Sequence, residues 1–101
     1  MPVTLQRHDS HWLIRLEGQV TIASAAELKT LLLEWLAAEK DLELDLADAE
    51  EIDITIMQLL WAAAREAART GAGFVARAST AAILAMRDAG FAQIPGFPGP
   101  G

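Results

Sequence analysis

Carboxylate side chains gather around one threonine in the middle of this 101-residue chain. The carboxylates belong to Asp48, Glu50, Glu51 and Asp53, and the hydroxyl belongs to Thr55. A divalent cation is their least favoured ligand, because the segment lacks the ligand spacing and the turn glycine of a calcium-binding loop. A solvated loop is favoured instead, since negative charge ahead of a helix stabilises its positive N-terminal end.

Thr55 is the one hydroxyl placed to carry a phosphate at the start of the helix that follows. The free amides of a helix N-terminus favour a phosphate there, so Thr55 is a candidate phosphoacceptor. Its spacing to Gln58 is also that of a capping box, in which the hydroxyl accepts a hydrogen bond from the Gln58 amide. We favour the cap, because the spacing to Gln58 already explains the threonine without phosphorylation, and the carboxylates just upstream would also repel a phosphate.

No other residue pattern supports catalysis. The chain holds no cysteine, and it offers neither a set of nucleophile, base and orienting group nor a phosphate-binding glycine loop. His8 and His11 flank Asp9 in a predicted turn, where two histidines without a third ligand favour surface residues over a metal site. We therefore expect a protein that is not an enzyme, with no catalytic residues, no cofactor and no metal.

The charge and the apolar segments of the chain exclude several kinds of partner. A formal net charge of −6 argues against nucleic acid and anionic membranes, since both are bound by clustered Lys and Arg. The N-terminal residues lack the basic and apolar parts of a signal peptide. The longest apolar run, residues 54 to 64, is interrupted by Gln58 and is too short to span a bilayer. We expect a soluble cytoplasmic protein without direct membrane insertion.

A strand and a helix must position the central carboxylates. Leucine alternates with acidic residues over residues 42 to 46, a period of two that predicts a strand with one face on the core. A polar loop over residues 47 to 51 then precedes a helix that begins near Thr55 and ends at Gly71. The apolar face of this helix is expected to hold Ile56, Met57, Leu60, Ala63, Ala64, Ala67 and Ala68.

The other elements follow from similar patterns. They are two strands over residues 3 to 7 and 12 to 17, a helix from about Ser24 to about Glu39, a strand over residues 73 to 78 and a helix from Ser79 or Thr80 to Gly90. Ser24 and Glu27 have the spacing of a second capping box, and Leu33 falls outside the apolar face of its helix. The end of the chain allows at most a short strand over residues 92 to 94.

These elements predict an α/β fold. The strands after the first hairpin are joined by helices, so part of the sheet should be parallel. Polar alternation in the central strand indicates that helices cover mainly one face. We expect a single layer of mixed β-sheet with about four to five strands, and about three to four helices packed mainly on one of its faces. The domain should span residues 1 to 94 and be followed by a Pro/Gly-rich tail of residues 95 to 101.

The order of short motifs resembles that of the STAS domain family, whose best-known members are anti-sigma factor antagonists. The resemblance runs from about Val3 to Ile94 and implies a STAS-like fold. In chain order the matching segments are Glu17-Gly18-Gln19-Val20, the helix over residues 26 to 36, the strand over residues 42 to 46, Ile52-Asp53, Gln58-Leu59-Leu60, Gly71, Ser79 and Ala89-Gly90-Phe91.

The loop before the central helix departs from the pattern of the antagonists. Asp53 matches their aspartate and Thr55 matches a following hydroxyl, but Ile54 occupies the position of the phosphoserine. Isoleucine cannot accept a phosphate, so the phosphoserine switch does not carry over to this chain. The motif is more similar to STAS proteins associated with chemotaxis and sensor kinases, and also to small STAS subunits that bind ABC transporters of the lipid-trafficking type.

The resemblance implies a protein interaction module that docks a sensor kinase, an anti-sigma-type kinase or another signalling protein. The alternative is a STAS subunit that binds the ATPase of an ABC transporter. Under either hypothesis the acidic group becomes a docking edge for a basic surface, and Trp61 is a candidate interface residue at the margin of the apolar stripe. The expected partner-binding residues are Glu50, Glu51, Asp53, Ile54, Thr55, Gln58, Trp61, Ala62 and Arg65.

Overall fold

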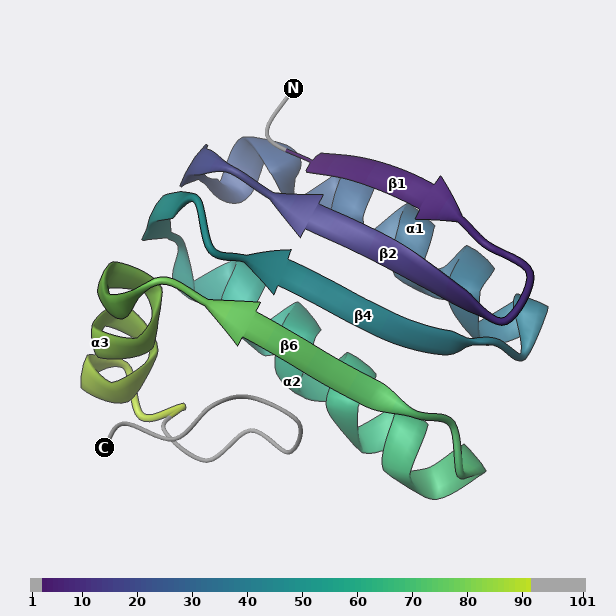
Figure 1. The fold of residues 1–101 in the computed structure, drawn as a ribbon. Helices are drawn as coiled ribbons and strands as arrows, with labels where there is room; N and C mark the ends of the chain where they lie inside the picture. The colour runs from purple at the N-terminus through teal and green to yellow at the C-terminus, as the bar shows by residue number, and fades with distance from the viewer. Residues whose placement is uncertain (1–2, 92–101) are drawn as a thin grey trace.

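The computed structural model describes residues 3 to 91, in which one layer of strands is backed by helices (Figure 1). In chain order the elements are β1 (Val3–Arg7), β2 (His11–Leu16), β3 (Gly18–Val20), the 3₁₀-helix η1 (Ile22–Ser24), α1 (Ala25–Ala38), β4 (Asp41–Leu46), β5 (Ala49–Ile52), α2 (Ile54–Thr70), β6 (Phe74–Ala78) and α3 (Thr80–Asp88).

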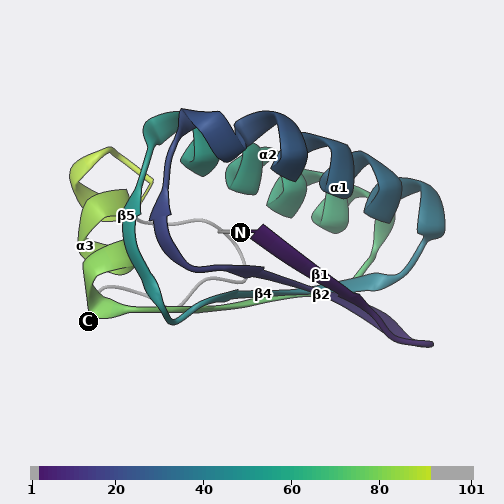
Figure 2. The same ribbon diagram turned by 90° about the horizontal axis from the view of Figure 1, so that it is seen from above.

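The main sheet has four strands in the order β1-β2-β4-β6. β1 and β2 form the expected antiparallel hairpin, whereas β4 runs parallel to both β2 and β6. Figure 2 shows α1 and α2 on one face of this sheet, and α3 at its end beside β5. The predicted α/β fold, with a mixed sheet and helices mainly on one face, is confirmed.

A second sheet of two short strands was not predicted. β3 and β5 pair in parallel, where the sequence pattern indicates a polar loop over residues 47 to 51. Ala49 and Ile52 of β5 are buried, while Glu50 and Glu51 between them are exposed. The loop prediction was wrong because β5 has only four residues and two of them are acidic, so its sequence has the composition of a loop. The residues at its two ends are buried by elements that are distant in sequence.

The core fills the space between the main sheet and the two long helices. Alternate side chains of β4 face inward as predicted, and each fully buried leucine contributes roughly 1.5 to 3 kcal/mol through removal from water. Trp35 of α1 is buried too, and its indole N–H donates to the Lys40 carbonyl at 2.6 Å. The predicted apolar face of α2 is buried except for Ala68, which is exposed. Its buried residues are Ile56, Met57, Leu60, Ala63, Ala64 and Ala67.

The N-terminus of α2 is capped by a different residue from the one predicted. Asp53 is the N-cap, and its Oδ1 accepts a hydrogen bond from the Thr55 amide at 2.8 Å. Thr55 lies inside the first turn, so the predicted capping box of Thr55 and Gln58 was wrong. The physical reason is that β5 keeps the chain extended as far as Asp53, which has φ −70° and ψ 150°. The predicted end at Gly71 is correct, with φ 80° and an N–H donated to the Ala67 carbonyl.

For the other two α-helices, the predicted N-cap was wrong for α1 and correct for α3. Ser24 precedes α1, but it makes no side-chain cap, because η1 already turns the chain and Thr21 accepts from the Ala23 amide. Ser79 does cap α3 by accepting from the Ala82 amide at 3.0 Å. Its hydroxyl also donates to the Ala49 carbonyl at 2.8 Å and so ties α3 to β5. The predicted strand over residues 92 to 94 and the domain boundary at residue 94 lie outside the described residues.

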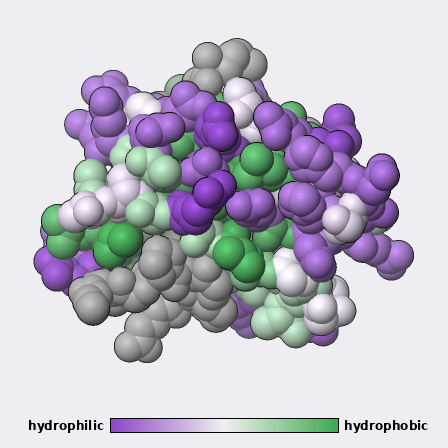
Figure 3. All heavy atoms as spheres, in the orientation of Figure 1, coloured by the Kyte–Doolittle hydropathy of each residue, from purple (hydrophilic) through white to green (hydrophobic). Residues whose placement is uncertain are grey.

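The face of the main sheet opposite the helices carries paired charges. Asp45 of β4 is buried there between Arg15 and Arg77, at 3.4 and 3.6 Å, and Arg77 also lies 3.2 Å from Glu43. Hydrophilic residues dominate the described part of this face in Figure 3. The face is therefore mainly polar, and no helix covers it in the part of the chain that the structure describes (Figures 1 and 2).

The cap assignment predicts unequal effects of two substitutions. Asp53→Ala should lower the free energy of unfolding by about 1 kcal/mol, because the Thr55 amide loses its acceptor. Thr55→Ala should change it by less than about 0.5 kcal/mol. Urea unfolding followed by circular dichroism measures both values, and an equal or larger loss in Thr55→Ala would contradict the assignment.

Candidate partner-binding surface

One row of exposed side chains runs along the solvent side of α2. Ile54, Gln58, Trp61 and Arg65 are spaced four, three and four residues apart, so they lie above one another on a single face of the helix. Ile54 is 52% exposed and Trp61 is 40% exposed, so both leave apolar surface in water on the same face of the helix. We call this row the Trp61 stripe.

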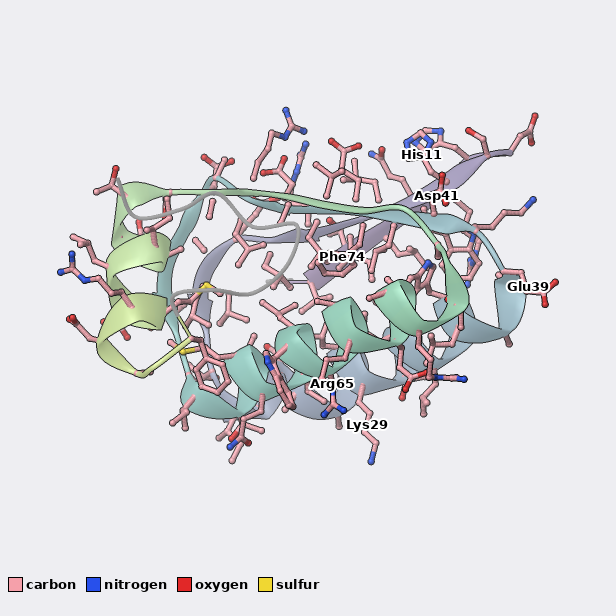
Figure 4. All side chains as sticks on the ribbon, turned by 90° about the horizontal axis from the view of Figure 1, so that it is seen from below. His11, Lys29, Glu39, Asp41, Arg65 and Phe74 are labelled. Carbon is pink, nitrogen blue, oxygen red and sulfur yellow. The ribbon has the colours of Figure 1, made fainter. Side chains whose placement is uncertain are left out.

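The Trp61 indole is held in place by its neighbour on the stripe. The guanidinium carbon of Arg65 lies 4.7 Å from the centre of the indole ring, which is a cation–π contact. Arg65 points away from the sheet in Figure 4. Stacking limits the rotamers of both side chains, so less conformational entropy is lost when a partner covers them.

Ile22 extends the apolar part of the stripe and was not predicted as a site residue. The parallel pair of β3 and β5 places Val20 opposite Ile52, and the Asp53 amide donates to the Val20 carbonyl at 2.9 Å. Two residues beyond this pair, the chain reaches Ile22 on one side and Ile54 on the other. Ile22 is 66% exposed, so two large isoleucines meet water at the start of η1 and α2.

The predicted acidic docking edge is only partly available. Glu50 and Glu51 are exposed on β5, beside the start of the Trp61 stripe. Asp53 already accepts a hydrogen bond as the cap of α2 and is half-buried. Asp48 is exposed in the turn before β5, where its carbonyl accepts from the Gly18 amide. Glu50 and Glu51 are therefore the carboxylates best placed to meet a basic partner surface.

Two of the predicted partner residues lie on a different side of α2. Ala62 borders a groove between α1 and α2, together with Leu59 and Glu66. Thr55 continues that row toward the N-terminus, since it precedes Leu59 by one helical turn. The structure thus divides the predicted partner residues of α2 into the Trp61 stripe and a second row that faces α1.

The charged groups of the second row are ionised at neutral pH. Arg69 donates to Glu66 through Nη2 at 2.7 Å and through Nε at 3.1 Å. This hydrogen bonding, with the nearby positive charge of Arg69, lowers the pKa of Glu66 below its ordinary value. The Glu66 carboxylate therefore stays ionised as the pH falls toward the ordinary pKa of a glutamate.

The side chains that could ligate a metal ion lie apart within residues 3 to 91. No group of three or more His, Cys, Asp or Glu residues comes together there in a way that could hold a metal ion. The rings of His8 and His11 stack at 4.8 Å, and His11 Nε2 lies 3.8 Å from Glu43. None of the helices in that range is long and apolar enough to cross a membrane.

Comparison with known proteins identifies the fold and the family. A family model described as "Mlab, STAS domain" matches residues 3 to 94. No curated protein sequence gives a significant match.

Two solved structures of SpoIIAA superimpose on the chain. The phosphorylated form, described as a Bacillus cell fate determinant, gives a TM-score of 0.75 at 12% identity and covers 96% of this chain and 89% of SpoIIAA. The unphosphorylated form, described as an anti-sigma factor antagonist, gives 0.73 at 13% identity with coverages of 95% and 86%. At such low identity these matches show a shared fold. Because the family match covers nearly the whole chain, this protein belongs to the STAS domain family.

Proposed function

We propose that this protein is a non-catalytic interaction module of bacterial signalling that acts in the cytoplasm. Its partner would be a sensor kinase, an anti-sigma-type kinase or a chemotaxis protein, as the STAS resemblance implies. The partner would dock on the Trp61 stripe and on the adjoining Ile22. The observation that carries this proposal is the exposure of Ile54 and Trp61 on one face of α2.

The composition of this surface is that of a protein interface. Tryptophan and arginine are enriched among the residues that carry most binding energy, and here Trp61 and Arg65 are already stacked. Ile22 and Ile54 add apolar surface, whereas Glu50 and Glu51 supply a polar margin. Covering the apolar centre would release water from it, and the acidic margin would favour a basic partner surface.

We propose that phosphorylation of this chain does not control docking. Ile54 has no hydroxyl, and Thr55 is half-buried on the row that faces α1 rather than on the Trp61 stripe. A phosphate on Thr55 would also lie close to the carboxylates of Glu51 and Asp53. The module would then be constitutively competent to bind, or it would be controlled through its partner.

A second candidate function is a STAS subunit that binds the ATPase of an ABC transporter. The exposed isoleucine at position 54 favours it, because an apolar side chain suits a permanent interface better than a phosphorylation switch does. The same Trp61 stripe would contact the ATPase.

A pull-down of the tagged chain from its native host, read by mass spectrometry, separates the two candidates. Recovery of a sensor kinase, a chemotaxis protein or a sigma-regulatory protein that requires Trp61 would support the signalling function. Recovery of a transporter ATPase that requires Trp61 would support the alternative. Partners that bind a Trp61→Glu variant equally well would contradict the proposed surface.

The central position of Trp61 predicts a large loss of affinity on substitution. Trp61→Glu should weaken binding to the recovered partner by roughly 30-fold, equivalent to about 2 kcal/mol, because a carboxylate would replace an indole that the partner covers. Isothermal titration calorimetry measures this effect. Leu84→Glu on α3 is the matched control, since Leu84 is 41% exposed and lies outside the stripe. Both variants should keep the circular dichroism spectrum of the wild type.

The environment of Thr55 predicts that it stays unmodified in cells. Mass spectrometry of the protein purified from its host should find the peptide that contains Thr55 without phosphate, because nearby carboxylates disfavour the added charge. Thr55→Ala should bind the partner within about twofold of wild type. A phosphate mapped to Thr55 would show instead that a switch operates at this helix end.

A further inference from the structure

A narrow apolar groove lies between α1 and α2, on the side of the helices away from the sheet. Its volume is about 180 Å³, and its lining is almost wholly apolar. Leu32 and Leu36 line it from α1, and Leu59 and Ala62 line it from α2. The groove is separate from the Trp61 stripe, none of whose residues lines it.

The size of the groove selects the kind of occupant. An enclosed cavity of roughly 150 Å³ holds one benzene molecule, whereas sites for drug-sized ligands and cofactors span roughly 300 to 1,000 Å³. A groove of about 180 Å³ therefore accepts one or two apolar side chains rather than a cofactor or a lipid chain. Two helices that flank such a groove leave room for the side chains of a third helix, which inserts residues three or four positions apart.

Leu33 extends the apolar surface beyond the groove. It lines the groove from α1 and is 56% exposed, so a large part of its side chain meets water in the described structure. A helix seated in the groove would cover it.

Charges at the borders of the groove argue for a partner of defined chemistry. Lys29 lies on the α1 border and points away from the sheet in Figure 4, and it has no ion pair within residues 3 to 91. Glu66 lies on the α2 border, but its charge is already paired with Arg69. The groove thus offers a free positive charge, which favours an acidic residue on the occupant. A second copy of this chain is disfavoured, because two molecules with net charge −6 repel each other.

We propose that the α1–α2 groove is a second docking site, occupied by one amphipathic helix of a protein partner. The helix inserts apolar side chains against Leu33, Leu36 and Leu59 and places an acidic residue opposite Lys29. This site goes beyond the proposed function, because it does not depend on the Trp61 stripe.

A synthetic helix tests the groove directly with the full-length chain. The probe is a hydrocarbon-stapled peptide of about 18 residues, or roughly five turns, with leucines along one face and a glutamate beside them. We expect a Kd on the order of 10 µM in fluorescence anisotropy, and shifts of the Leu33, Leu36 and Leu59 methyl signals in NMR. Leu33→Asp should weaken binding by roughly tenfold. Val75→Asp on β6, where Val75 is 59% exposed, is the matched control and should bind within about twofold of wild type.

A charge exchange tests the role of Lys29. Lys29→Glu should weaken binding of this peptide by roughly fivefold and should strengthen binding of a matched peptide that carries lysine in place of the glutamate. Arg87→Glu on α3 is the control, because it changes the net charge of the protein by the same amount as Lys29→Glu. It should change the affinities for the two peptides by the same factor.

Several outcomes would overturn the proposal. The methyl signals of Leu33, Leu36 and Leu59 would stay unchanged when the peptide is added, or the Leu33→Asp variant would bind the peptide as tightly as the wild type. A dimer in sedimentation that Leu33→Asp abolishes would show that a second copy of the chain occupies the groove. Displacement of the peptide by decanoate or by phosphatidylglycerol vesicles would show that the groove binds a lipid. Trp61→Glu should leave peptide binding unchanged, so failure of the groove and failure of the Trp61 stripe are distinguished.

Discussion

The short parallel pairing of β3 with β5 determines where the helices begin. Val20 and Ile52 are opposite each other and both buried, and the Asp53 amide donates to the Val20 carbonyl at 2.9 Å. Immediately after this pair one segment turns into η1 and the other into α2. The two helix starts are therefore fixed side by side, which brings together Ile22 and Ile54 although they are far apart in sequence. The exposed apolar surface depends on this pairing.

The sequence predicts the elements whose signals are local. The alternation over residues 42 to 46 and the helical spacing of α2 are each contained in one segment, so β4 and the buried face of α2 could be recognised. β5 could not, because its burial comes from β3 and α3 rather than from its own pattern. The same strand keeps Asp53 extended and makes it the cap in place of Thr55, so one missed element caused two errors.

The candidate surface shows a similar division between local and non-local information. A helical wheel is enough to place Ile54 and Trp61 together on the exposed side of α2. It cannot show that Ala62 faces a groove, because that depends on where α1 packs. Nor can it find Ile22, whose exposure follows from the pairing of two short strands. A helical wheel predicts which residues of one helix share a face, but it cannot predict which residues meet across elements.

The two faces of the molecule differ in what docking would cost. On the open face of the sheet, Arg15 and Arg77 already pair with Asp45, and a partner would have to remove water from these charges without improving their pairing. On the helix side, Ile54 and Trp61 leave apolar surface in water, and covering it yields roughly 25 cal/mol for each Å². Solvation thus favours the helix side for both proposed contacts. An isoleucine at position 54 strengthens this asymmetry, because it adds apolar area where a phosphorylated side chain would carry charge.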